Sequence, residues 1–334
     1  MRRKLISLLF ALTTLPLAAQ TPATPPAAKP DEKYTEEVAV SYVMIPFTVL
    51  GEKGAPIVDL KAKEVSLLVD GQPVPSDMFE KSMNAPVSWT VLLDLSGSMG
   101  LAGKLDAARA AVGVLLSRRK PGDDFSLFVF SAGHAREVVP FTEDPMKIAA
   151  AMDNVKPWGK TAFFDALSEM PERSGAGKNG ARAIILLSDG IDNFSRMSKA
   201  EIEKRLEGVS VPIYALGLRD PREQKYAPKV VTEELTDVAL LEELANRTGG
   251  KLYIGNQPQQ LASAMDGIES NLRAQYLLGF EPTGKGAVKY RRISLQVAGR
   301  VRSVRVRAGY RGTEPPILSA TSRGKSRSNE RKKS

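Results

Sequence analysis

Oxygen-bearing side chains stand directly after an apolar segment in the first third of the chain. Asp94, Ser96 and Ser98 belong to the sequence DLSGSM, which follows the apolar run WTVLL. A strand that ends at Asp94 would bring these oxygens to the crevice at the carboxyl edge of an open α/β sheet, where such sheets bind ligands. Gly97 lets the backbone fold back between the two serines, so we expect both hydroxyls to face one point.

The types of these side chains favour a hard divalent cation. Oxygen ligands suit Mg²⁺ first and Mn²⁺ or Ca²⁺ next, whereas a structural zinc site would use Cys or His. The chain has no cysteine and a single histidine, His134. We therefore expect a site of the magnesium type.

The motif resembles the metal-ion-dependent adhesion site of the von Willebrand factor A (VWA) family, which combines D-x-S-x-S with a distant Thr and a distant Asp. In this chain GKTAFFDAL supplies the Thr, and AIILLSDG supplies the Asp after another apolar run. The resemblance covers about residues 89 to 274. It implies that five residues hold a metal ion, directly or through water: Asp94, Ser96, Ser98, Thr161 and Asp189.

Two positions depart from the family pattern. Lys160 stands where the family often has Gly, and Ile191 stands where SDGED is common. The flanking segments KGAPIVDL, LLVDGQ and YLLGF look like those of a bacterial subfamily of exported VWA-related proteins. The resemblance therefore extends beyond the motif itself.

The charge of the predicted site indicates how it would be used. Two carboxylates and three neutral hydroxyls leave a dication without surplus negative charge, so the ion stays electrophilic toward another oxygen. A Glu or Asp of a partner protein can complete its coordination, which is how the resemblance implies that such domains bind proteins. We expect a protein-binding adhesion or scaffold protein and not an enzyme.

Three alternatives stay open. The metal could activate water for hydrolysis, but no general base stands beside the motif, since His134 lies in the turn SAGHARE. The chain could instead be a metal-free structural scaffold of the cell envelope. Finally, Ser96, Ser98 and Thr161 could merely cap helices and turns, as these residue types often do.

Alternating strand and helix patterns predict the fold class of residues 87–274. The short apolar runs TVLLD, FSLFVF, AIILLSD and PIYALGL have the length of buried strands, and apolar residues recur at helical spacing over 105–116 and 261–272. This alternation favours a doubly wound, Rossmann-like α/β domain of VWA type, with a mostly parallel sheet.

Strand-like segments flank this domain on both sides. Residues 34–86 contain VAVSYVMIPFTVL, IVDL and VSLLV, and residues 275–312 contain YLLGF, YRRISLQV and RSVRVRAGY. A turn is expected at Asp70 and Gly71. One economical interpretation is that the two sets pair into a single smaller β module, with the α/β domain inserted between them.

The N-terminal residues predict export. Basic residues 2–4 precede an apolar stretch and the small pair Ala18-Ala19, which is typical of a signal peptide over residues 1–19. A membrane anchor is the alternative, but a spanning helix needs about 20 apolar residues, more than this stretch supplies. Residues 20–33 predict a linker rich in Pro and Ala, and residues 313–334 a disordered basic tail. We expect a periplasmic or secreted protein.

The net charge of +9 is not spread evenly. Residues 20–284 carry 29 basic and 36 acidic side chains, so this acidic body gives no support for binding nucleic acid. Nine basic residues and no acidic ones lie between Lys285 and Arg311. They could attract an acidic partner or anionic lipid headgroups, but we favour a solvated strand face that balances the acidic body.

Overall fold

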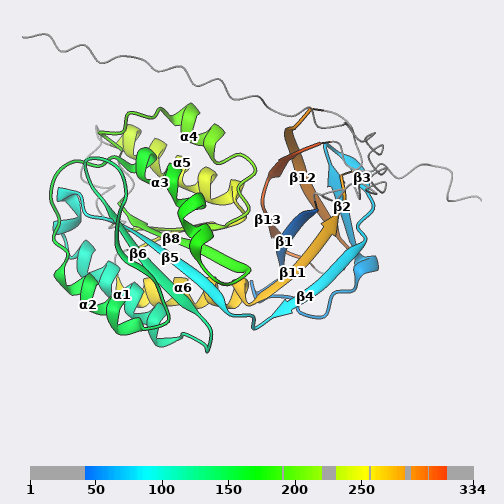
Figure 1. Cartoon of the computed structure of the whole chain (residues 1–334), viewed down its shortest axis with the longest axis horizontal. Helices are drawn as coiled ribbons and strands as arrows, with labels where there is room; N and C mark the ends of the chain where they lie inside the picture. The colour runs from blue at the N-terminus through cyan, green and yellow to red at the C-terminus, as the bar shows by residue number, and fades with distance from the viewer. Residues whose placement is uncertain are drawn as a thin grey trace, which may run out of the picture. The chain divides into compact units, whose positions relative to one another are not determined.

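A six-stranded sheet forms the centre of the α/β domain in this computed structural model (Figure 1). The strand order is β10-β9-β8-β5-β6-β7, and all neighbours are parallel except β6 and β7. Every residue of β5 and β6 is buried, because helices cover both faces of these apolar segments. The strands are β5 (Val87–Asp94), β6 (Asp124–Phe130), β7 (Arg136–Thr142), β8 (Ala181–Ser188), β9 (Ile213–Gly217) and β10 (Lys251–Ile254).

Helices cover the two faces of this sheet in two groups (Figure 1). Trp89 and Val91 of β5 face one cluster with α1, α2 and α6, whereas Leu92 faces a second cluster with α3, α4 and α5. The helices are α1 (Lys104–Ser117), α2 (Pro145–Asn154), α3 (Phe163–Arg173), α4 (Lys199–Arg205), α5 (Val231–Arg247) and α6 (Pro258–Leu272). The predicted doubly wound α/β fold is confirmed.

Strands from both sides of the α/β domain pair with one another. Two four-stranded sheets, β13-β1-β11-β4 and β14-β12-β2-β3, enclose a third apolar cluster that includes Phe47, Tyr276 and Phe280. The strands are β1 (Val43–Leu50), β2 (Val65–Val69), β3 (Gln72–Val74), β4 (Met78–Met83), β11 (Ala274–Phe280), β12 (Lys289–Val297), β13 (Ser303–Val306) and β14 (Gly309–Gly312). We call these strands the β module. Three short 3-10 helices complete the described elements: η1 (Ala62–Glu64), η2 (Gly97–Gly100) and η3 (Ser174–Ala176).

The predicted turn between β2 and β3 is present, but the predicted strand at Ile57–Leu60 is wrong. Asp70 and Gly71 have φ angles of 50° and 80°, as a two-residue hairpin turn requires. In the IVDL segment, by contrast, the Leu60 N–H donates to the Tyr276 hydroxyl, which in turn donates to the Ile57 carbonyl. The Ile57 N–H does donate to the Val49 carbonyl of β1, but the Tyr276 side chain satisfies the next two groups, so no strand continues along this segment.

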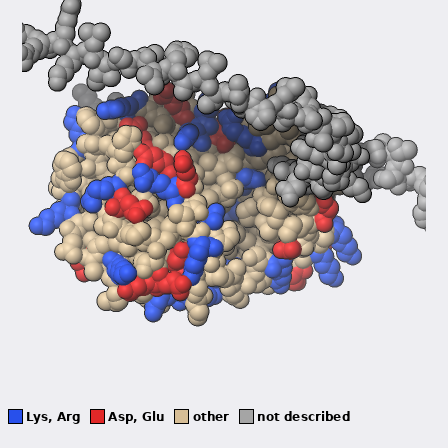
Figure 2. Space-filling model, in the orientation of Figure 1, with Lys and Arg blue, Asp and Glu red and all other residues tan. Residues whose placement is uncertain are grey.

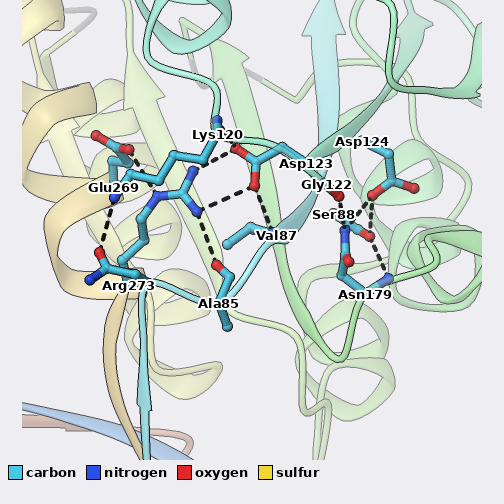
Figure 3. A network of polar contacts seen from close by, with 11 residues as sticks. Ala85, Val87, Ser88, Lys120, Gly122, Asp123, Asp124, Asn179, Glu269 and Arg273 are labelled. Carbon is cyan, nitrogen blue, oxygen red and sulfur yellow. Dashed lines mark hydrogen bonds and ion pairs between the residues drawn. The ribbon is translucent and has the colours of Figure 1, made fainter.

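Arg273 forms ion pairs and hydrogen bonds at the point where the chain enters and leaves the α/β domain (Figure 3). It follows α6, is 5% exposed, and pairs with Asp123 at 2.5 Å and with Glu269 at 2.9 Å. The guanidinium also donates to the Ala85 carbonyl, and Asp123 accepts from the Val87 N–H. The chain segment before β5 and the segment after α6 are thus held by one buried ion pair.

Arg307 corrects the expectation of a solvated basic face. It is 7% exposed, and its guanidinium donates to the carbonyls of Gly208, at 3.2 Å, and of Met44, at 2.9 Å. Burial lowers the pKa of Arg307 to about 10. The alternation in β13 does place valines against the module core, but the opposite side meets the loop after α4 instead of water.

Of the other basic residues between Lys285 and Arg311, some contact the α/β domain and some are exposed to solvent. Arg305 donates to the Gly250 carbonyl at 3.0 Å, and Arg311 pairs with Glu207 at 2.7 Å. The Gly208 and Gly250 carbonyls follow α4 and α5, and the C-terminal end of a helix carries partial negative charge that favours cations. Lys289, Arg292 and Arg302 are exposed, as expected.

The structure describes residues 42–189, 192–219, 231–255, 257–282, 287–299 and 301–313, all of which fall in one compact unit. The predicted signal peptide, the linker and, beyond Thr313, the basic tail lie outside these residues. Among the described helices, none is both long and apolar enough to cross a bilayer. On the face shown in Figure 2, acidic and basic side chains of the described residues alternate, so that face offers no continuous basic track to a long polyanion.

Candidate metal centre

Asp94 is the last residue of β5, and its carboxylate is fully buried. Its Oδ1 accepts from the Ser96 N–H at 2.7 Å, and its Oδ2 accepts from the Ser188 hydroxyl at 2.7 Å. Ser188 ends β8, which runs parallel to β5 with Leu93 opposite Leu187. The register therefore brings the ends of two strands to one edge, as predicted from the apolar runs.

Burial has a large effect on the ionisation of Asp94. Removal from water raises the pKa of its carboxyl from 3.8 to about 6, and the nearby Asp189 raises it further. The hydrogen bonds from Ser96 and Ser188 act in the opposite direction. The protein holds this carboxylate charge at a cost, so a bound cation would be favoured there.

Ser96 and Ser98 face each other, with their hydroxyl oxygens 3.0 Å apart. The 3-10 turn η2 begins at Gly97, and its N–H donates to the Gly159 carbonyl at 3.0 Å. A Cβ at position 97 would lie 3.4 Å from that same oxygen. Glycine therefore matters here because another loop approaches closely, and the expected convergence of the hydroxyls is present.

Thr161 lies in the loop that approaches this turn. In addition to the bond at Gly97, the Trp158 N–H donates to the Leu95 carbonyl at 2.6 Å. The Thr161 N–H donates to Asn193 Oδ1 at 2.9 Å, and its carbonyl accepts from the Asn193 N–H. Three loops, around residues 95–98, 158–161 and 192–194, thus meet at the carboxyl edge, and Thr161 is 2% exposed.

Asp189 follows β8 and is 2% exposed. Its Oδ2 pairs with the Lys104 ammonium at 3.0 Å, and its main-chain carbonyl accepts from Arg219 Nε at 2.7 Å. Its Oδ1 is buried without a hydrogen-bond partner. One oxygen of this carboxylate is therefore neutralised internally, and the other is left available to a ligand.

Lys104 is the residue that sequence reasoning missed. It is the first residue of α1 and is 8% exposed. Lys160, which stands where the family often has Gly, makes a different contact: its ammonium lies 4.7 Å from the centre of the Phe194 ring. A signal for Lys104 was present: it stands four residues before Ala108, on the apolar face traced for this helix.

The donor set fits a hard cation. No group of three or more His, Cys, Asp or Glu side chains among the described residues could hold a metal, so a cation site there must also use other oxygens, such as hydroxyls. The carboxyl edge supplies both kinds of oxygen, together with the unpartnered Asp189 Oδ1. The chemistry of these residues suits Mg²⁺, Mn²⁺ or Ca²⁺.

The fold and the sequence define the class of protein. Residues 90–191 match the model of the von Willebrand factor type A domain. These residues thus form a VWA-type domain, which confirms the resemblance carried by the D-x-S-x-S motif.

Individual relatives are more distant. An uncharacterized protein of Borreliella burgdorferi is 27% identical over 194 residues, which cover 52% of this chain and 55% of the relative, so the chain spans about half the length of that relative. Among solved structures, a von Willebrand factor type A protein from Catenulispora acidiphila is 15% identical, with a TM-score of 0.46 over 83% of this chain and 74% of that one. An aerotolerance-related membrane protein from Bacteroides fragilis, carrying multiple mutations to serines, is 20% identical, with a TM-score of 0.41 over 56% of this chain and 98% of that one.

Proposed function

We propose that this protein binds a divalent cation, Mg²⁺ before Mn²⁺ or Ca²⁺, and uses it to bind a carboxylate of a partner protein outside the cytoplasm. The location outside the cytoplasm is inferred from the predicted signal peptide. The metal would be held, directly or through water, by Asp94, Ser96, Ser98, Thr161 and Asp189.

The observation that carries the proposal is the unpartnered Oδ1 of Asp189. A buried acceptor without a partner costs about 1–3 kcal/mol, and more when it is charged. A cation at the carboxyl edge would remove this cost and would also favour the ionised form of Asp94. The bound ion supplies electrophilic attraction for one further oxygen ligand.

The charge of the site supports a carboxylate as that ligand. Asp94 and Asp189 contribute two negative charges, and the positive charge of Lys104 neutralises one of them through its ion pair. A bound dication would leave the centre with a net positive charge, larger than the ligand types alone suggest. An Asp or Glu side chain of a partner would neutralise it.

The loops around the centre also expose large apolar side chains. Leu101, Trp158 and Phe194 are 64%, 67% and 48% exposed. Trp158 and Phe194 belong to two of the three meeting loops, and Leu101 comes three residues after Ser98. Exposed apolar groups gathered in one place are typical of a protein-binding surface. The partner segment that fits this rim has an acidic residue flanked by apolar ones.

Tryptophan fluorescence tests the proposal, because the chain has two tryptophans and Trp89 is fully buried. We expect Mg²⁺ to change the emission of Trp158, and Asp189→Ala to weaken cation binding at least about tenfold. The exposed residue Asp153 provides the control Asp153→Ala, which removes the same charge elsewhere. Equal binding in both variants would refute the site.

A second experiment addresses the carboxylate. A peptide with one Glu between apolar residues should quench or shift Trp158 emission when Mg²⁺ is present, and a chelator should abolish the change. The same peptide with Gln in place of Glu should not bind. If both peptides bind equally with and without chelator, the rim binds apolar segments without help from a metal.

A metal-free scaffold is the second candidate, and the Lys104–Asp189 ion pair favours it, because the ammonium already neutralises one proposed ligand. Calorimetric titration decides between the two. Heat with Mg²⁺ or Mn²⁺ that disappears in Asp189→Ala supports metal binding, and no heat with either ion supports the scaffold.

A metal-dependent hydrolase has less support. Hydrolysis would need a general base near the metal, and the chain's one histidine, His134, has a side chain that is 74% exposed and pairs with Glu169 at 2.6 Å. A phosphoesterase screen with Mg²⁺ or Mn²⁺ tests this alternative, since turnover that is lost in Asp94→Ala would establish it.

A further inference from the structure

A basic cleft lies between the edge strands β10 and β13, away from the residues of the candidate metal centre. Its volume is about 480 Å³, and its walls come from the turn after β1, from β10, from α6 and from β13. None of the lining residues, all of which are described, is Asp or Glu. The polar ones that matter are Lys53, Lys251, Tyr253, Asn271, Arg302 and Arg305.

Backbone carbonyls hold the two arginines without neutralising them. Arg302 donates to the Glu52 carbonyl at 3.1 Å, and Arg305 donates to the Gly250 carbonyl at 3.0 Å. The Nε of Arg305 is buried and has no hydrogen-bond partner. Carbonyl acceptors do not neutralise the two guanidinium groups, which retain their positive charge.

Lys251 adds a third cation to the same cleft. Its ammonium lies 4.7 Å from the centre of the Tyr253 ring. Burial lowers the pKa of Lys251, and Arg305 and Arg302 lower it further, while Glu242 has a smaller opposing effect. Positive charges therefore crowd this cleft, and the described carboxylates do not balance them.

We propose that this cleft binds an oxyanion of the phosphate type, with Arg305, Arg302 and Lys251 as its ligands. Guanidinium groups match the geometry of phosphate oxygens and can donate two hydrogen bonds to one group. The Arg305 Nε–H would gain the partner that it lacks. The cleft is independent of the metal, because the residues that line it include none of the five proposed metal ligands.

Titration with inorganic phosphate, in the presence of a chelator, tests the proposal. We expect wild-type protein to bind phosphate, and Arg305→Met and Lys251→Met each to weaken binding about tenfold, since a hydrogen bond to a charged group contributes that much. Arg292→Met is the matched control, because Arg292 is exposed on β12. Asp189→Ala should bind phosphate normally, which separates this site from the metal centre.

Loss of fold and loss of the site can be distinguished. Arg305→Lys keeps the charge but not the paired donors, so it should bind more weakly than wild type and more tightly than Arg305→Met. Urea denaturation of each variant shows whether the fold is intact. Absence of phosphate binding by wild-type protein, or equal weakening in Arg292→Met, would overturn the proposal.

The source of the anion is resolved by a second arm. Sedimentation with phosphatidylglycerol vesicles, with and without competing inorganic phosphate, tests a lipid headgroup. Vesicle binding that phosphate displaces and that Arg305→Met loses assigns the cleft to a lipid phosphate. Phosphate binding without vesicle binding assigns it to a soluble phosphate-type ligand.

Discussion

The ammonium of Lys104 lies 3.0 Å from Oδ2 of Asp189, and both side chains are almost fully buried. The two residues are 85 positions apart in the chain. Their contact places an internal positive charge at the edge of the sheet where the family motif predicts a metal ion. Any cation that binds there is repelled by this ammonium and competes with it for Asp189.

Lys104→Met should destabilise the metal-free protein and strengthen cation binding. Removing one partner of a buried ion pair costs about 3–5 kcal/mol, because the remaining charge is left unpaired. Mg²⁺ should restore much of that loss and should bind at least about tenfold more tightly than to wild type, since the repulsion is gone. Urea denaturation with and without Mg²⁺ measures both effects.

Lys147→Met provides the control for this prediction, because Lys147 is exposed on α2. It should change neither the stability nor the response to Mg²⁺. A Lys104→Met variant that Mg²⁺ stabilises no more than wild type would show that the ion pair does not oppose the cation.

The raised pKa of Asp94 predicts a pH dependence of the metal-free protein. The folded state binds this proton more tightly than the unfolded chain, since the pKa is about 6 in the fold and 3.8 otherwise. Stability from this group is therefore greatest below about pH 4 and is lost as the pH rises toward 6. Two pKa units correspond to about 3 kcal/mol.

Asp94→Asn isolates this effect, because it keeps the shape and removes the titration. In chelator, we expect the variant to be the more stable protein above pH 6 and to lack this part of the pH dependence. Denaturation at a series of pH values, for both proteins, gives the difference. Parallel curves for the two would show that Asp94 titrates normally.

Arg273→Met should cost about 3–5 kcal/mol, because it leaves the buried carboxylate of Asp123 without its cation. Arg118→Met is the comparison, since Arg118 pairs with Asp266 of α6, the helix that Arg273 follows, and both side chains are about half exposed. An exposed pair contributes less than about 1 kcal/mol. Similar losses in the two variants, measured by urea denaturation, would contradict the role of Arg273 at the junction.

Arg307→Ala should weaken the attachment of the β module to the α/β domain. The change removes the charged donor of two partly buried carbonyls, those of Gly208 and Met44. A hydrogen bond that involves a charged group contributes about 1.5–3 kcal/mol. Arg311→Ala removes a half-exposed ion pair with Glu207 and should cost under about 1 kcal/mol. Thermal unfolding compares them, and equal losses would rule out a special role for Arg307.

Local sequence patterns were sufficient for the fold class. The runs that became β5, β6 and β8 are continuously apolar because both faces of a parallel sheet are covered, and this can be read without knowing what covers them. The strand predicted for the IVDL segment was wrong for a related reason. Its apolar residues do pack beside the module core, but packing alone does not show whether a strand or the Tyr276 hydroxyl satisfies the backbone.

Part of the candidate site could also be predicted from local sequence patterns. Asp94, Ser96 and Ser98 are neighbours in the chain, so their convergence follows from one strand end and one turn. Lys104 faces the same edge from a helix, and its partner Asp189 comes much later in the sequence. Whether a lysine at the start of an apolar face reaches solvent or a carboxylate depends on how helix and sheet pack.

Tertiary packing likewise decided which charged residues are buried. Arg305 and Arg307 alternate with valines, which is the pattern of a strand with one solvated face, yet that face meets the α/β domain. Arg273 is buried only because α6 returns the chain to the point where β5 began. Period and residue type report which side of an element is apolar, whereas the surroundings of its polar side depend on long-range contacts between segments far apart in the chain.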